Sequence, residues 1–136
     1  MISLDAFYKK GLNGQKRALP WAMLYARTIR DSLSNRPQLD EENVFYTGFS
    51  YGGRQVLNEL YKNSNIHLWR ALAASEPDCN TFPAPRKVSV PLLILKGGES
   101  HYPPEPCKIM SSLYKKVGSK FELEILPKSN HHFSHN

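Results

Sequence analysis

The hydrophobic positions of the chain recur with a helical period in three segments. The first, 20–34, begins at a proline, which suits the first turn of a helix, and places these side chains on one face: Trp21, Leu24, Tyr25, Thr28, Ile29 and Leu33. Asn35 and Pro37 are expected to end it. The second segment follows the glycines at 52–53 and is expected to end near 63–65, and the third runs from Pro104 to Gly118. Each predicted helix is amphipathic, so each needs a partner for its apolar face.

Four further segments have the composition or the spacing of β-strands. Residues 44–47 are β-branched or aromatic, and 68–75 is rich in the small residues that suit a central strand. Residues 91–95 are continuously apolar, which is typical of a strand buried on both faces of a parallel sheet. The alternation in 121–126 indicates a half-buried edge strand, whereas three prolines within 76–90 predict a long loop. The order of helices and strands therefore predicts an α/β fold, a mostly parallel sheet with flanking helices.

Composition adds several expectations. The 136 residues fit one domain, 1–136, whose first 19 residues are only weakly patterned. No apolar run approaches the roughly 20 residues that cross a bilayer. The first 20 residues lack the apolar core of a signal peptide, so a cytoplasmic protein is expected unless the chain is a piece of an exported precursor. The net charge of +6 is scattered, which favours a solvated surface over a nucleic-acid or membrane partner.

The two cysteines, Cys79 and Cys107, form no C-x-x-C motif and are expected to be reduced, unpaired thiols in a cytosolic chain. Their spacing gives no support for a zinc site. We expect neither a metal nor an organic cofactor.

The strongest chemical signal is the motif G-x-S-x-G at Gly48–Gly52, between a predicted strand and a predicted helix. In such a nucleophile elbow the serine backbone is strained, and the two glycines prevent collisions within the turn. The turn would present the hydroxyl of Ser50 at a helix N-terminus, where backbone N–H groups favour negative charge. The N–H of Tyr51 would be one donor to an oxyanion. The alternative, a glycine-rich turn with Ser50 as a helix cap, has the weaker support.

Polar residues after the predicted strands complete a candidate triad. Catalytic groups of α/β sheets lie at the carboxyl ends of the strands, and there Ser50, Glu99 and His131 follow one another as nucleophile, acid and base. The serine needs a histidine to take its proton, and the carboxylate orients the imidazole. Asp78 is an alternative acid and His132 an alternative base. If no carboxylate reaches the histidine, the site is a dyad.

Several pieces of the sequence carry a family resemblance: the motif at 48–53, the strand and loop at 91–97, the helix start at Pro104-Glu105-Pro106-Cys107, and His131-His132-Phe133 after Leu126-Pro127. From about Pro20 to its end, the chain resembles the C-terminal half of an α/β hydrolase, most closely the dienelactone hydrolase family. The resemblance implies an α/β-hydrolase-like fold that is truncated at its N-terminal side. Similar cysteines occur in some members of that family, where a disulfide would imply an exported parent protein.

Three departures from the family pattern shape the expectations. The family often has cysteine at the elbow, and Ser50 moves the likeness toward esterase-type or peptidase-type relatives. The acid position of the family, three residues after Gly97, holds Ser100 here, so the neighbouring Glu99 is the expected substitute. The strands that precede the elbow, with the loop that gives a second oxyanion N–H, have no counterpart before Pro20. We therefore expect a fragment whose exposed strand edge promotes self-association.

These features predict a serine hydrolase that cleaves an ester, lactone or similar acyl bond through an acyl-enzyme. Ser50 would attack, His131 would act as base, Glu99 would orient it, and the Tyr51 N–H would stabilise the oxyanion. The expected partner is a small-molecule acyl substrate. Two alternatives stay open: a serine peptidase of the prolyl-oligopeptidase type, and a catalytically silent remnant that serves in binding or assembly.

Overall fold

The computed structural model describes residues 26–34, 36–38, 40–60 and 63–132, and the chain divides into two compact units, Met1–Leu39 and Asp40–Asn136. In the first unit the described residues form a helix over 26–33, inside the segment that its periodicity predicts to be helical. The weakly patterned segment 1–19, and Trp21, Leu24 and Tyr25 of the predicted helix, lie outside the described residues. No helix in the described ranges is both long enough and apolar enough to cross a membrane.

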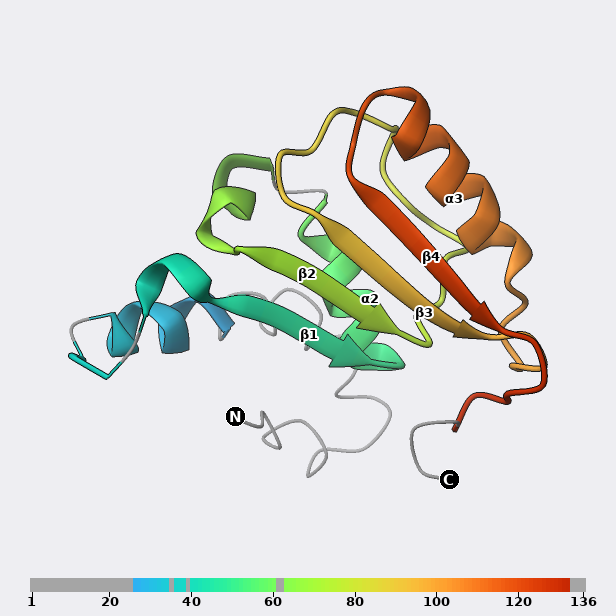
Figure 1. Cartoon of the computed structure of the whole chain (residues 1–136), viewed down its shortest axis with the longest axis horizontal. Coiled ribbons are helices and arrows are strands. Elements are labelled where there is room, and N and C mark those ends of the chain that lie inside the picture. The colour runs from blue at the N-terminus through green and yellow to red at the C-terminus, as the bar shows by residue number, and fades with distance from the viewer. Residues whose placement is uncertain (1–25, 35, 39, 61–62, 133–136) are drawn as a thin grey trace. The chain divides into compact units, whose positions relative to one another are not determined.

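The second unit is built on a four-stranded sheet (Figure 1). Its strands are β1 (Phe45–Phe49), β2 (Ala71–Ser75), β3 (Leu92–Gly97) and β4 (Phe121–Leu126). They lie side by side in chain order, and each neighbouring pair is parallel. All four predicted strands are therefore confirmed, as is the prediction of a mostly parallel sheet. Because every strand runs the same way, their carboxyl ends meet along one edge of the sheet.

Helices join β1 to β2 and β3 to β4, whereas residues 76–91, between β2 and β3, form a long loop as their prolines predict. The 3₁₀ helix η2 (Glu41–Asn43) precedes β1, α2 (Tyr51–Asn58) and the 3₁₀ helix η3 (Asn63–Leu68) join β1 to β2, and α3 (Glu105–Lys116) joins β3 to β4. In Figure 1, α2 runs behind the strands and α3 runs alongside β4. The helix after Ser50 is shorter than its periodicity predicts, and β2 begins three residues later than predicted. The indole of buried Trp69 donates a hydrogen bond to Glu59 Oε2 at 3.1 Å, which fastens the connection before β2 to the end of α2.

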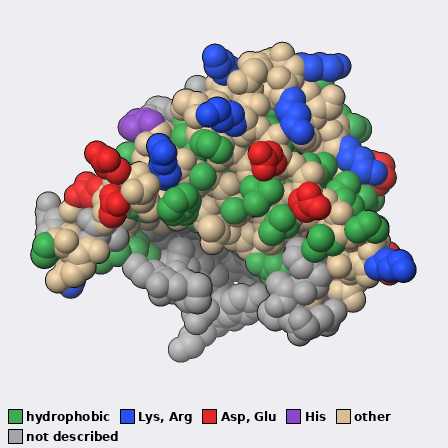
Figure 2. Space-filling model, in the orientation of Figure 1, with side chains coloured by type: hydrophobic (Ala, Val, Ile, Leu, Met, Phe, Trp, Pro, Cys, Tyr) green, Lys and Arg blue, Asp and Glu red, His purple; other side chains and the backbone are tan. Residues whose placement is uncertain are grey.

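The two faces of the sheet differ in burial. Side chains in register on one face are fully buried, among them Leu72, Leu92 and Phe121. On the other face Leu93 is only half-buried and its neighbour Glu122 is exposed. Figure 2 shows hydrophobic and acidic side chains together over the strands, on the side turned toward the viewer. The alternation in β4 thus gives a half-buried edge strand, as its sequence predicts.

Strand β1 is the outermost strand on the other side of the sheet from β4. Among the described residues it pairs only with β2. Phe45, its first residue, is 58% exposed. The unpaired N–H and C=O groups of an edge strand are a template for pairing with another chain, and exposed apolar residues strengthen this tendency. Self-association through this edge stays a prediction.

Cys79 and Cys107 form a disulfide, so the prediction of two unpaired thiols is wrong. The bond joins the long loop after β2 to the first turn of α3. The prediction assumed the reducing conditions of a cytosolic chain. The two cysteines follow β2 and β3, neighbouring parallel strands whose carboxyl ends lie together, and this arrangement allows the pairing. The bond anchors the loop after β2 at Cys79, three residues beyond Glu76.

Replacing both cysteines by serine is expected to lower the free energy of unfolding by about 3 kcal/mol, because the cross-link restricts the unfolded chain over a loop of this length. Chemical denaturation of the oxidised chain and of the double variant measures the difference. Adding a reductant to the unchanged chain should give the same loss, whereas the double variant should not respond to it. Equal midpoints for all samples would contradict the prediction.

Candidate active site

Ser50 lies in a strained turn between β1 and α2. Its backbone has φ 52° and ψ −113°, a conformation that residues with a side chain rarely adopt. The Ser50 N–H donates to Ser75 O at 2.8 Å, which holds the turn against the end of β2. A Cβ on Gly48 would collide with the carbonyl of Gly52, as the elbow motif predicts. At Gly52 a Cβ would meet nothing, so the motif's second steric expectation is wrong at this residue.

The second close approach in the turn is at Gly53. A Cβ there would lie 2.8 Å from Ser75 O and 3.2 Å from Gly48 O. The first turn of α2 therefore lies directly against the ends of β1 and β2. This packing fixes where the Ser50 hydroxyl emerges from the sheet edge.

His131 reaches Ser50 from the loop after β4. Its Nε2 lies 2.9 Å from Ser50 Oγ, so the structure brings the predicted nucleophile and base together. The loop after β3 lies directly against the loop after β4, which carries His131. The N–H of Gly98 donates to Leu126 O, and a Cβ on Gly97 would collide with Ser129 O. The loop that carries His131 can lie this close to the end of β3 only because Gly97 has no side chain.

The carboxylate at His131 belongs to Glu76 and not to Glu99. Glu76 Oε2 lies 3.0 Å from His131 Nδ1, on the ring side opposite Ser50. Glu99 is exposed to solvent, so its assignment as the acid is corrected. Glu76 immediately follows β2, and with φ 53° it is, beside Ser50, the other described non-glycine residue with a positive φ. Such strained backbone persists where surrounding packing imposes it, commonly at functional sites.

Glu76 is completely buried and accepts four hydrogen bonds. Its Oε2 accepts from His131, from Ser100 Oγ at 2.5 Å and from Lys96 Nζ at 3.0 Å, and its Oε1 accepts from the N–H of Gly97. Because an ionised carboxylate only accepts, His131 presents its N–H at Nδ1. In the neutral ring Nε2 is then an acceptor for the Ser50 hydroxyl.

The other predicted residues have different surroundings. Asp78 pairs with Arg54, at 3.5 Å between Oδ2 and Nη1, so the alternative acid faces the guanidinium. Arg54 Nη1 also donates to the carbonyl of Asp78 at 3.0 Å, and the side chain braces this loop. The exposed ring of His132 lies beside His131, with 5.1 Å between ring centroids. Tyr51 is the first residue of α2, directly after the serine, and its role as oxyanion donor stays a prediction.

Ser100 contacts both members of the acid–base pair. Its Oγ donates to Glu76 and lies 3.5 Å from His131 Nδ1. The N–H of Tyr102 donates to this oxygen at 3.3 Å. Ser100 occupies the position where the resemblance places an acid. The carboxylate that contacts the histidine comes instead from Glu76, directly after the neighbouring strand β2.

The electrostatic environment keeps the acid ionised and the base neutral. Burial raises the pKa of Glu76, but hydrogen bonds from Ser100, Gly97 and Lys96 outweigh it, and the net pKa is lowered. Burial lowers the pKa of His131. The bond to Glu76 opposes that effect, but nearby His101 and His132 add to it, and the pKa lies below its ordinary value. A neutral imidazole is the form that accepts a proton.

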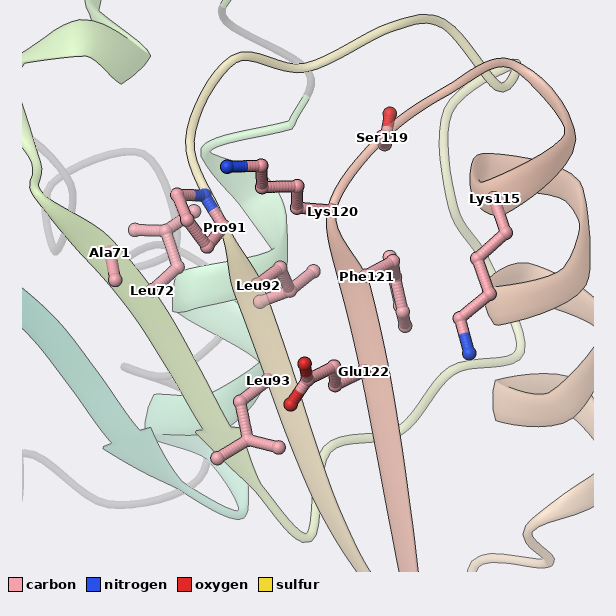
Figure 3. A pocket seen from close by; sticks show the side chains of 10 residues that line it. All are labelled: Ala71, Leu72, Pro91, Leu92, Leu93, Lys115, Ser119, Lys120, Phe121 and Glu122. Carbon is pink, nitrogen blue, oxygen red and sulfur yellow. The ribbon is translucent and has the colours of Figure 1, made fainter.

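A cavity of about 580 Å³ opens at the amino ends of β2, β3 and β4 (Figure 3). Lys115, Lys120 and Glu122 are the charged residues of its lining. The Ser50 site lies at the carboxyl ends of the strands, so the cavity is separate from it. In the described ranges no group of three His, Cys, Asp or Glu side chains is placed to hold a metal ion.

Comparison with known proteins gives matches among solved structures. A putative dienelactone hydrolase from Klebsiella pneumoniae is 19% identical, with a TM-score of 0.64 over 82% of this chain and 49% of that one. A thermophilic esterase from Thermogutta terrifontis is 15% identical, with a TM-score of 0.66 over 85% of this chain and 56% of that one. An acylaminoacyl peptidase from Pyrococcus horikoshii is 18% identical, with a TM-score of 0.62 over 79% and 23%. No family model and no curated protein matches the chain.

These similarities establish the fold. The chain has the α/β-hydrolase fold, as the resemblance implies, and it spans about half or less of the length of these similar structures. At such low identities the likeness concerns the arrangement of the backbone. Any chemistry at Ser50 has to be argued from the side chains of this chain.

Proposed function

We propose that the chain is a serine hydrolase that cleaves an ester, lactone or similar acyl bond through an acyl-enzyme. The observation that carries the proposal is the continuous hydrogen-bonded series from Ser50 through His131 to Glu76. A strained serine at a helix N-terminus, a base on its hydroxyl and an acid behind the base are the parts that acyl transfer requires. The α/β-hydrolase fold supports the proposal, because similar structures carry the names of esterases and peptidases.

Each residue has one role in the proposed reaction. Ser50 Oγ attacks the carbonyl carbon while His131 Nε2 takes the hydroxyl proton. The carbonyl oxygen becomes negative and accepts a hydrogen bond from the N–H of Tyr51. His131 then gives its proton to the leaving group, and the acyl group stays on Ser50. A water molecule, deprotonated by His131, then attacks the carbonyl carbon of the acyl-enzyme ester. His131 returns this proton to Ser50 Oγ as the bond to the serine breaks and the acid product leaves. Glu76 holds the imidazole in place throughout.

A serine peptidase is the second candidate, because structures of acylaminoacyl peptidases are among those similar to the chain. Hydrolysis of short acyl-peptides without hydrolysis of simple aryl esters would favour it. A silent remnant is the third candidate, because the chain spans only part of each similar structure.

The proposal is tested by exposing the purified chain to a fluorophosphonate, a probe that phosphonylates activated serines. We expect one label per chain, located at Ser50 by mass spectrometry and absent from Ser50→Ala. Circular dichroism of both proteins confirms that they are folded. A folded chain that takes no label would overturn the proposal and favour the silent remnant.

A further inference from the structure

The buried ion pair behind the histidine has no part in the proton transfers described above. Lys96 lies in β3, directly after the apolar run at 91–95, and its side chain is completely buried. A buried ammonium is stable only where it is paired and hydrogen-bonded. All three of its protons have an acceptor: Glu76 Oε2 at 3.0 Å, Pro77 O at 3.2 Å and Ser100 Oγ at 3.4 Å.

The position of the acid explains why a cation is needed there. Glu76 is as buried as Lys96, and burial raises the pKa of a carboxyl that has no counter-charge. A protonated acid could turn its hydroxyl toward His131 and offer a donor where the imidazole N–H needs an acceptor. Two neutral donors, Ser100 Oγ and the N–H of Gly97, also lower the pKa of Glu76, so the carboxylate keeps its negative charge when Lys96 is replaced.

We propose, on the basis of the proposed function, that Lys96 is a positioning residue. Its ammonium helps to keep the Glu76 carboxylate ionised and aligned on His131. Its positive charge also offsets part of the negative charge that Glu76 exerts on the imidazole. Lys96 and His131 bind the same oxygen, Glu76 Oε2, so they share the charge of one carboxylate. The ring therefore gains less from becoming charged than it would beside a carboxylate alone.

The consequence concerns the pH range of the base. His131 accepts the serine proton only when its ring is neutral, which holds above its pKa. Any group that disfavours the charged ring extends activity to lower pH. The other titratable groups at the ring are His101 and Tyr102 on the loop after β3, and His132 on its own loop. Loss of the Lys96 charge should raise the pKa of His131 and move the acid limb of the pH profile upward.

The test is a titration of the imidazole ¹⁵N signals by NMR, which needs no turnover. His131 is identified by the signal that is missing from His131→Asn. We expect its midpoint to lie below about 6.5 in the unchanged chain and to rise by about one pH unit in both Lys96→Met and Lys96→Gln. The control is Lys120→Met, which removes the same charge. Lys120 is exposed and directly precedes β4, at the end of the sheet away from His131, so the midpoint should stay unchanged.

Several outcomes would overturn the proposal. A midpoint above about 7 in the unchanged chain would mean that Lys96 does not offset Glu76. Unmoved midpoints in both Lys96 variants would mean that it only fills space, and a midpoint that moves in Lys96→Met but not in Lys96→Gln would assign the effect to a hydrogen bond. If neither single variant folds, Glu76→Gln/Lys96→Met removes both charges and should restore folding. Failure of the double variant as well would contradict the pairing.

The rate of fluorophosphonate labelling against pH separates this proposal from the proposed function. Labelling in the unchanged chain with an acid limb that moves upward by about one pH unit in the Lys96 variants supports both. Labelling with an unmoved limb overturns the role of Lys96 alone. Shifted NMR midpoints in a chain that takes no label would leave the pairing intact and overturn the proposed function.

Discussion

Replacing His131 by asparagine is expected to lower the turnover of an activated ester such as p-nitrophenyl butyrate by about 10⁶-fold, to the residual level that binding and the oxyanion donor provide. His131 Nε2 is 2.9 Å from Ser50 Oγ and is the described group that can take the serine proton. Without it Ser50 stays a neutral alcohol, a poor nucleophile at neutral pH. The measurement is steady-state hydrolysis at pH 8, where the imidazole is neutral, supported by the rate of fluorophosphonate labelling.

His132→Asn is the matched control. The two histidines are adjacent in sequence, but the ring of His132 is exposed, and its backbone N–H is bound to Asn130 Oδ1 at 2.8 Å. We expect its turnover to stay within a few-fold of the unchanged chain. If instead His132→Asn abolished hydrolysis and His131→Asn retained it, the sequence alternative of His132 as base would be correct.

Local sequence signals predicted most of the fold because each one reflects a local cause. The apolar run at 91–95 correctly predicts the position of β3, a central strand. The expected burial on both faces is found on one face only, because Leu93 and Leu95 are half-buried. Pro104 directly precedes α3, and Gly118, with φ 82°, follows it, as the start and stop signals predict. The end of α2 was predicted less well, because the buried contact of Trp69 with Glu59 is formed by residues ten positions apart.

The acid could not be predicted in the same way. Ser50 and His131 stand in motifs, whereas Glu76 stands in a segment that its prolines mark only as a loop. The rule that catalytic groups follow the carboxyl ends of strands applies to Glu76 as well, because β2 ends at Ser75. A second signal is Lys96, which directly follows the apolar run at 91–95 within the same strand, since a buried lysine requires a buried carboxylate. Glu76 and Lys96 lie 20 residues apart in the sequence, so their pairing has no local signal.

Replacing Glu76 by glutamine is expected to lower turnover by about 10⁴-fold, the loss that an amide in place of the orienting acid causes in a serine triad. An amide NH₂ at this position can donate to His131 Nδ1 and so favour the tautomer whose Nε2 carries a proton and cannot accept one from Ser50. The substitution also leaves Lys96 buried beside a neutral group, so thermal unfolding is measured in parallel.

Glu99→Gln is the matched control, since it makes the same chemical change on an exposed residue of the loop that follows β3. Its turnover and its unfolding temperature should be unchanged. If Glu99→Gln lost activity while Glu76→Gln kept it, the acid expected from the sequence would be restored and Glu76 would be a structural partner of Lys96. If the folded Glu76→Gln variant loses turnover and Glu99→Gln keeps it, the acid of this site is the residue that follows β2. The resemblance implies an acid after the neighbouring strand, β3.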